Sequence, residues 1–272
     1  MPELPEVETT RRGIEPYVRG RRIGKIVIRD ARLRWPVAES LPRQAENRRI
    51  IAVQRRAKYL LLRLEDNGTL ILHLGMSGSL RLVAAVEPVL AHAHLDIVLS
   101  DGQALRYTDP RRFGSLHWSA GDPAQHHLLA RLGPEPLSSA FDTAYLHGRS
   151  RGRRASIKAF LMDSRMVVGV GNIYANEALH RAAIRPMSPA GRISRKRYAR
   201  LVQAVKAVLA EAIDVGGTTL RDFTGSDGRP GYFRQRLEVY GRDGALCHRC
   251  AGCIRVERRG QRATYYCPGC QF

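Results

Sequence analysis

The sequence predicts a multidomain α+β protein: an N-terminal antiparallel β domain with a flanking helix, a helical C-terminal domain and a four-cysteine zinc finger. Three observations support this prediction. Short apolar runs separated by turn residues fill positions 22–118, the apolar period becomes helical after about residue 150, and all five cysteines follow residue 246. A chain of 272 residues is long enough for two domains.

The N-terminal part shows the pattern of many short strands. Asp66-Asn67-Gly68 and Asp101-Gly102 are typical of tight hairpin turns between consecutive strands. Such spacing favours an antiparallel sandwich or barrel. A short helix over residues 7–18 precedes the strands, and Gly20 follows its end. We expect strands at residues 23–29, 50–55, 59–64, 69–74, 79–83, 95–99, 105–107 and 115–118.

The C-terminal part shows helical periodicity. We expect helices at residues 155–163, at 173–183 with Asn172 as N-cap, and at 194–214, where Gly216-Gly217 ends the last one. Residues 218–231 form a polar, glycine-bearing loop that is too long for a simple connector. The turn-rich stretch after Gly133 marks the boundary. The predicted domains are 1–133, a linker at 134–150, a helical domain at 151–235 and a finger at 236–272.

The charge balance indicates a polyanionic partner. The formal net charge is +20, and all but five of the 45 basic residues are arginine. A basic excess of this size is typical of nucleic-acid binding. An anionic membrane surface is the rival partner, but no basic amphipathic helix with an aromatic face stands out. No apolar run approaches about 20 residues and no signal peptide precedes the acidic start, so we expect a cytoplasmic protein.

The cysteine spacing predicts a metal site. Cys247-x-x-Cys250 and Cys267-x-x-Cys270 are separated by sixteen residues, a pattern typical of one structural Zn²⁺ held by four thiolates. Cys253 is interpreted as a spare thiol, because its use would leave Cys247 unpaired. The hairpin between the two pairs carries several arginines suited to phosphate binding, namely Arg255, Arg258, Arg259 and Arg262.

The first residues suggest a nucleophile. Removal of Met1 would leave Pro2 with a terminal secondary amine, which can attack a carbonyl to form an iminium ion. Glu3, Glu6 and Glu8 follow in an otherwise basic chain. The plainer interpretation is a helix start, since Pro5 presets φ and carboxylates suit the positive end of a helix dipole.

Four further motifs have a functional and a plain interpretation. The loop from Asp109 to Gly114 and the turn Gly75-Met76-Ser77-Gly78 could insert into a duplex, or could be ordinary turns with packed side chains. Lys58 lies where one strand ends and the next begins, and its plain interpretation is an ordinary solvated lysine. Gly169-Val170-Gly171-Asn172 opens a helix and could bind phosphate, but it is too short for a dinucleotide-binding motif.

Together these motifs resemble the formamidopyrimidine-DNA glycosylase family, bifunctional enzymes that excise oxidised purines. The matching stretches are residues 2–9, 54–62, 73–82, 106–114, 167–175, 226–233 and the cysteine finger. The related endonuclease VIII-type enzymes differ after Pro2-Glu3 and in the two loops. The resemblance implies a β-sandwich, a helix-two-turn-helix domain and a zinc finger, with damaged double-stranded DNA between the domains.

The resemblance also implies residue roles. Pro2 attacks C1′ to form a Schiff base, Glu3 is the general acid/base, Lys58 transfers protons and contacts phosphate, and Arg262 serves phosphate binding and δ-elimination. Residues 218–232 close over the extruded base. The implied DNA contacts are Met76, Arg111 and Phe113 in the void, and His92, Arg153, Lys158 and Asn172 on the backbone. Arg153 stands where lysine is common, which changes the donor geometry.

The sequence is compatible with three functions. The leading one is a monomeric glycosylase and abasic-site lyase for oxidised purines that needs no nucleotide cofactor. The alternatives are an oxidised-pyrimidine glycosylase of endonuclease VIII type and a non-catalytic zinc-finger DNA-binding protein. A binding module has no use for a free terminal proline followed by Glu3, so the N-terminus discriminates between them.

Overall fold

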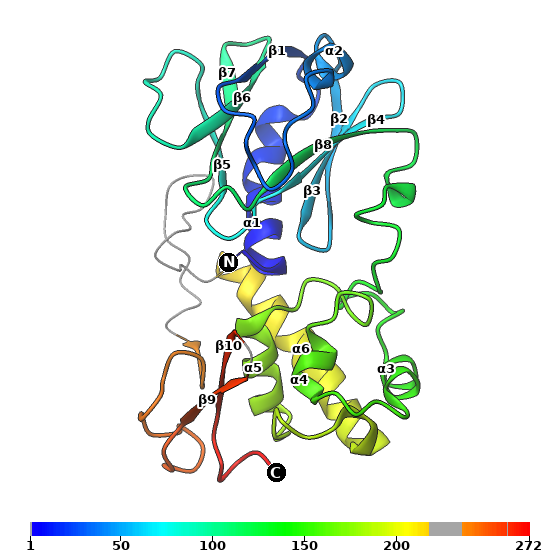
Figure 1. Ribbon diagram of the computed structural model, residues 1–272, viewed down its shortest axis with the longest axis vertical. Coiled ribbons are helices and arrows are strands. Elements are labelled where there is room, and N and C mark those ends of the chain that lie inside the picture. The colour runs from blue at the N-terminus through cyan, green and yellow to red at the C-terminus, as the bar shows by residue number, and fades with distance from the viewer. Residues whose placement is uncertain (1, 218–235, 260) are drawn as a thin grey trace. The chain divides into compact units, whose positions relative to one another are not determined.

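The computed structural model describes residues 2–217, 236–259 and 261–272 (Figure 1). These residues form two compact units, the first from residues up to 130 with 215–217, and the second from residues 131–214 with those described after 235. Among the described residues, no helix combines the length and apolarity that crossing a bilayer requires. The predicted loop at 218–231 lies outside the described residues.

The first unit is a sandwich of two antiparallel sheets preceded by the helix α1 (Leu4–Val18). One sheet has the order β1-β6-β7-β5 and the other β2-β3-β4-β8. The sandwich prediction is confirmed, and the barrel alternative is wrong because the two sheets are separate. The strands are β1 (Ile23–Ile28), β2 (Ile50–Arg56), β3 (Tyr59–Leu64), β4 (Gly68–His73), β5 (Ser79–Ala84), β6 (Ala93–Leu99), β7 (Gln103–Thr108) and β8 (Ser115–Ala120).

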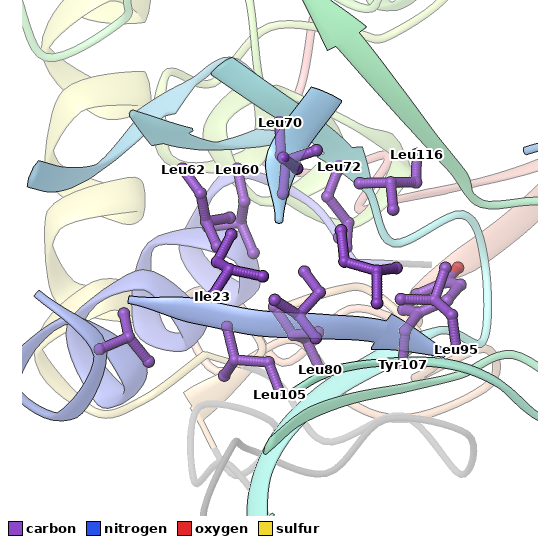
Figure 2. Packing of buried hydrophobic residues seen from close by; sticks show 14 of the residues in the cluster. Ile23, Leu60, Leu62, Leu70, Leu72, Leu80, Leu95, Leu105, Tyr107 and Leu116 are labelled. Carbon is purple, nitrogen blue, oxygen red and sulfur yellow. The ribbon is translucent and has the colours of Figure 1, made fainter. Parts of the chain in front are cut away.

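The core lies between the two sheets. Figure 2 shows leucines of β3, β4 and β8 facing Ile23 of β1 and the inward side chains of β5, β6 and β7. Leu60, Leu62, Leu70 and Leu72 are all fully buried. Burial of such side chains stabilises a domain by about 1.5–3 kcal/mol each. These buried side chains belong to the short apolar runs from which the sequence predicted strands.

Local chemistry explains where these elements begin and end. Asp66 and Asn67 have φ of 56° and 59° between β3 and β4, as a hairpin turn of the primed type requires. Helix α1 begins at Leu4, three residues earlier than expected, because Glu3 and Glu6 form a capping box. A short helix, α2 (Leu41–Ala45), was not predicted, since five residues are too few to show a helical period.

The second unit contains α3 (Thr143–Ser150), α4 (Ile157–Leu161), α5 (Asn172–Arg181) and α6 (Arg195–Asp214). Helix α3 was not predicted, although its N-cap Asp142 accepts a hydrogen bond from the Tyr145 N–H at 2.7 Å. Helix α5 corrects the expected cap: Gly171 is the N-cap and Asn172 is the first helical residue. Short 3₁₀ turns occur at Pro123–Gln125 in the first unit and at Ala190–Arg192 in the second.

The chain ends in a hairpin of β9 (Arg255–Arg259) and β10 (Arg262–Tyr266). The strands are antiparallel, with Arg262 opposite Arg259 and Tyr266 opposite Arg255. Helix α5 contacts β10 and also packs on α4 and α6. The hairpin expected between the two cysteine pairs is therefore present and rests on the helical part of its own unit.

Candidate active site and metal centre

The N-terminal turn is buried and tightly organised. Pro2 is buried, and Glu3 and Glu6 are 1 % and 2 % exposed. The Glu6 carboxylate accepts the Glu3 backbone N–H at 2.8 Å, while the Glu3 carboxylate accepts the backbone N–H of Glu6. Gly217 lies so close that a Cβ there would be 2.9 Å from Glu6 Oε1. The carboxylates of Glu3 and Glu6 are therefore shielded from solvent and held in place by hydrogen bonds to the backbone.

Glu8 connects the N-terminal helix to the neighbouring sheet. It forms ion pairs with Arg11 at 2.9 Å, Arg12 at 3.1 Å and Arg55 at 3.1 Å. Although burial opposes the change, these arginines lower the pKa of Glu8. The capping box belongs to Glu3 and Glu6. Glu8 instead joins α1 to β2 through Arg55.

Arg55 extends this connection to the predicted Lys58. Its guanidinium donates to Glu8 at 3.1 Å and to the backbone carbonyl of Ala57 at 3.0 Å. Ala57 has φ of 56° in the turn between β2 and β3, and Lys58 follows it half-buried. The turn that carries Lys58 is thus held by the same carboxylate that holds the N-terminal helix.

His73 lies near Lys58, and its environment favours the neutral form of its imidazole ring. Burial, together with the positive charges of Lys58 and Arg34, lowers the pKa of His73 to about 4. His73 Nδ1 accepts the Gly75 backbone N–H at 3.0 Å, which fixes the start of the Gly75–Gly78 turn. The Tyr59 ring lies 4.9 Å from the His73 ring.

The two loops that were candidates for duplex insertion lie side by side. Gly75 has φ of 70°, and a Cβ on it would be 2.4 Å from the backbone nitrogen of Gly114. Met76 is half-buried, and Arg111 is exposed with its guanidinium carbon 5.0 Å from the centre of the Phe113 ring. Phe113 is 43 % exposed. A large apolar ring left in solvent favours the binding interpretation over a packed turn.

The predicted metal centre has the geometry of a four-thiolate site. The sulfurs of Cys247, Cys250, Cys267 and Cys270 all lie within 4.8 Å of one another. The Sγ–Sγ distances are 3.8 Å for Cys247–Cys270 and 3.4 Å for Cys250–Cys267. Tetrahedral zinc with bonds of about 2.3 Å separates its sulfurs by about 3.8 Å, so the residues fit this metal. Cys253 is exposed and is not a member of the cluster.

Helix α5 supports this centre through polar residues that the sequence analysis missed. Glu177 accepts the backbone N–H groups of Glu238, Val239 and Tyr240 at 2.8–3.0 Å. Asn176 Oδ1 accepts the Tyr265 N–H at 3.0 Å, and His180 Nε2 lies 3.6 Å from Cys247 Sγ. All three side chains are at most 1 % exposed. Asn172 and Arg181 of the same helix are polar as well, so nothing in the sequence of α5 singled out these three residues.

The remaining predicted residues of the second unit differ in exposure. Arg153 and Arg262 are exposed, and Asn172 is half-buried. Lys158 is 6 % exposed, with Nζ 2.7 Å from the Ala263 carbonyl and 2.9 Å from Thr264 Oγ1 in β10. Lys158 and Arg262 line a cavity of about 280 Å³ together with Met162 and Met187. The expected backbone contact His92 is an exposed residue of the first unit with φ of 66°.

Family models match both parts of the chain. Residues 1–116 match the formamidopyrimidine-DNA glycosylase N-terminal domain, and residues 132–224 match the formamidopyrimidine-DNA glycosylase H2TH domain. These matches and the cysteine cluster define the class first: a DNA-glycosylase fold of β-sandwich, helix-two-turn-helix and candidate zinc finger.

Relatives and solved structures agree over nearly the full length. The chain is 62 % identical to the formamidopyrimidine-DNA glycosylase of Alkalilimnicola ehrlichii and 59 % to that of Stutzerimonas stutzeri, with all of each chain covered. The Thermus thermophilus MutM (Fpg) structure has a TM-score of 0.89 and 43 % identity, covering 99 % of this chain and 98 % of that one. Lactococcus lactis Fpg bound to abasic-site DNA has a TM-score of 0.92 and 32 % identity, covering 99 % of each.

The chain belongs to the formamidopyrimidine-DNA glycosylase family. The resemblance drawn from its motifs is confirmed, and with it the expectation of an enzyme of the glycosylase and abasic-site lyase class. Its family places it in the base-excision repair of damaged DNA.

Proposed function

We propose that this protein excises oxidised purines, 8-oxoguanine and formamidopyrimidines, from duplex DNA and nicks the resulting abasic site by β,δ-elimination. The observation that carries the proposal is the buried N-terminal turn in which Pro2 adjoins the capped pair Glu3 and Glu6. The structure of Lactococcus lactis Fpg in complex with a Fapy-dG-containing DNA is similar to this chain, with a TM-score of 0.91. That relative supports a purine-derived lesion as the substrate.

The chemistry begins at Pro2 once Met1 is removed. A neutral α-amine, with an ordinary pKa near 8, is available at physiological pH more readily than a lysine amine. Its nitrogen attacks C1′, the glycosidic bond breaks, and the base leaves with a proton. Glu3 delivers a proton to O4′ as the C1′–O4′ bond opens, which leaves an iminium ion between Pro2 and the sugar.

The same intermediate permits strand cleavage. Loss of a C2′ proton expels the 3′ phosphate, and a second elimination expels the 5′ phosphate, before water releases the sugar fragment from Pro2. Lys58 is assigned proton transfer and phosphate contact around these steps. Arg262 is assigned phosphate binding during δ-elimination. Both are cations, which suits groups that stabilise departing phosphates.

DNA contacts accompany the chemistry. Extrusion of a base costs a few kcal/mol of unstacking, which inserted side chains and phosphate contacts offset. Met76, Arg111 and Phe113 fill the void, with Arg111 facing the orphaned cytosine. His92, Arg153 and Asn172 contact the backbone. Lys158, whose ammonium group is bonded to β10, contributes by holding the finger in place.

The metal and the cellular setting complete the proposal. Cys247, Cys250, Cys267 and Cys270 would hold one Zn²⁺, which supplies structural stability to the finger and no reaction step. The protein acts as a monomer in the cytoplasm, bound to the nucleoid, without a nucleotide cofactor. Its charge of +20 supports association with DNA.

One experiment tests the catalytic assignment. The protein is incubated with a duplex containing 8-oxoguanine opposite cytosine and then reduced with borohydride, and the cross-link is mapped by peptide mass spectrometry. We expect a covalent adduct on Pro2, and Pro2→Gly should lose most of it. A matched control retains every side chain but carries an uncleaved N-terminal extension, which blocks the amine.

The outcomes separate the hypotheses. Absence of any adduct in protein that lacks Met1 would contradict catalysis by Pro2 and favour the non-catalytic DNA-binding alternative. A strong preference for thymine glycol over 8-oxoguanine would favour the endonuclease VIII-type alternative. An adduct that forms equally in the extended control would place the nucleophile elsewhere.

A further inference from the structure

The strand registers bring three segments with proposed DNA contacts to one end of the sandwich. The loop of residues 74–78 passes from β4 to β5, and the loop of residues 109–114 passes from β7 to β8, so both cross from one sheet to the other. His73 is paired with Ser115, and Ser79 with Thr108. Thr108 is also paired with Ala93, the residue after His92. Asp109 therefore sits where the three segments meet.

The carboxylate of Asp109 is fully buried and binds both loops. Oδ1 accepts the Ser77 hydroxyl at 2.7 Å and the Arg111 backbone N–H at 3.3 Å. Oδ2 accepts the Gly114 N–H at 2.8 Å and the Tyr107 hydroxyl at 3.1 Å. Burial, reinforced by this carboxylate, raises the pKa of Tyr107 well above its ordinary value, which keeps the hydroxyl a donor. Each oxygen thus receives one backbone and one side-chain donor.

The backbone of Asp109 binds the third segment. Its N–H donates to the His92 carbonyl at 3.0 Å, and its carbonyl lies 2.8 Å from His94 Nε2. His92 has φ of 66°, a left-handed conformation that a non-glycine residue adopts at a cost. The hydrogen bond from Asp109 stabilises that conformation.

The two loops are closely packed around the Asp109 carboxylate. A Cβ on Gly114 would lie 1.7 Å from the Tyr107 hydroxyl, and one on Gly78 would lie 2.1 Å from the Leu74 carbonyl. The loops are in backbone contact around the carboxylate. A change in its hydrogen bonding must therefore move the segments that carry Met76, Arg111 and Phe113.

We propose that Asp109 is the positioning residue that holds both inserting loops and the His92 segment in the geometry needed to extrude the damaged base. The inference rests on the proposed function and extends it, since the motif roles assign no task to this carboxylate. Because Asp109 is fully buried, it acts through the loops that it binds and not by contact with the DNA. Its effect is specific for steps in which a stacked base must leave a duplex.

Asp109→Asn is the sharpest test. Asparagine keeps the shape of the side chain but has one acceptor oxygen instead of two. In either orientation its NH₂ group faces a backbone N–H, that of Arg111 or that of Gly114, and a backbone N–H can only donate. Two activities are compared: removal of 8-oxoguanine from a duplex, and borohydride trapping on a single-stranded oligonucleotide with an abasic site. The second needs Pro2 but neither base extrusion nor a void to fill.

We expect duplex excision to fall on the order of 10- to 100-fold, because a misplacement of about 1 Å can slow a reaction by about 100-fold. Single-strand trapping should stay within about twofold of the unmodified protein. Asp66→Asn is the matched control: it removes the same charge from a side chain that is 80 % exposed in the β3–β4 turn. It should leave both activities unchanged.

A second variant covers the case in which Asp109→Asn does not fold. Ser77→Ala removes the donor to Asp109 Oδ1 at 2.7 Å and an acceptor of the Arg111 N–H at 3.2 Å. It should lower duplex excision about three- to tenfold, with trapping retained. A parallel fall of both activities in the folded variants, or no fall in duplex excision, would overturn the positioning role. If the unmodified protein performs neither reaction, the proposed function itself fails.

Discussion

At the residue scale, exposure separates two cations with the same expected task. Lys158 and Arg153 were both expected to contact the DNA backbone. Arg153 is exposed, whereas the ammonium group of Lys158 is bonded to the Ala263 carbonyl and the Thr264 hydroxyl. A phosphate contact by Lys158 would compete with these bonds. The two residues should therefore affect DNA binding in different ways.

The salt dependence of binding measures the difference. For Arg153→Gln we expect the slope of log K against log salt to become shallower by about 0.9, as for one lost phosphate contact on duplex DNA. Lys158→Met should weaken binding without changing that slope by more than about 0.3. It should also destabilise the second unit by about 1–3 kcal/mol, because the half-buried Ala263 carbonyl and the buried Thr264 hydroxyl lose their donor.

Fluorescence anisotropy titrations at several salt concentrations, with thermal melts of each variant, provide both quantities. Equal changes of slope in the two variants would contradict the indirect role of Lys158.

The sequence identified Lys158 and Arg153 as matches to one set of motif positions. It could not predict which ammonium or guanidinium group faces solvent, because that depends on how β10 packs against α4.

At the element scale, α5 is the support of the finger. Its side chains Asn176, Glu177 and His180 reach β10, the segment 238–240 and Cys247 respectively. Burial raises the pKa of Glu177, while the three backbone N–H groups it accepts oppose the rise. A buried acceptor with three donors is costly to alter, since each unsatisfied donor loses its solvation.

Glu177→Gln tests the support. The amide would turn donor hydrogens toward backbone N–H groups, so we expect a loss of about 1–3 kcal/mol in the stability of the second unit. Zinc should also leave faster when a chelator is added. Glu211→Gln is the control, because it removes the same charge from the partly exposed pair with Arg181, which contributes under about 1 kcal/mol.

Zinc release followed with a chromogenic chelator, and calorimetric melts, supply the comparison. Equal behaviour of the two variants would show that the finger is held by its metal without α5.

Elements with strong periodicity were predictable from sequence: all eight sandwich strands and α6 occur within a few residues of the expected positions. Helices α2 and α3 were missed, since five and eight residues give little periodic signal.

At the scale of the whole molecule, the division into two units allows each to be monitored separately. Both tryptophans of the chain, Trp35 and Trp118, belong to the sandwich unit. Trp35 lies 5.5 Å from the His117 ring, which in turn is 5.6 Å from His126 and 6.3 Å from His127. Tryptophan fluorescence therefore reports the unfolding of this unit and the charge state beside it.

The histidine cluster gives this unit an acid-sensitive stability. Burial, with the nearby His126 and His127, lowers the pKa of His117 from 6.5 to about 4. Burial, and then His127, also lowers the pKa of His126. Because the folded pKa lies below the unfolded one, the unfolded chain binds more protons between these values. Stability is complete above pH 6.5 and declines as the pH falls toward 4.

His117→Phe isolates this contribution, since it keeps a ring against Trp35 and removes the proton site. A pKa unit corresponds to about 1.4 kcal/mol, and after allowance for partial solvent exposure we expect His117 to account for about 1–2 kcal/mol of the loss between pH 7 and pH 4.5. Urea unfolding followed by tryptophan fluorescence measures it at the two pH values. The variant should lose correspondingly less stability on acidification than the unmodified protein. An identical pH dependence in both would mean that protonation of His117 is not coupled to unfolding, and that other carboxylates and histidines govern the acid sensitivity of the sandwich.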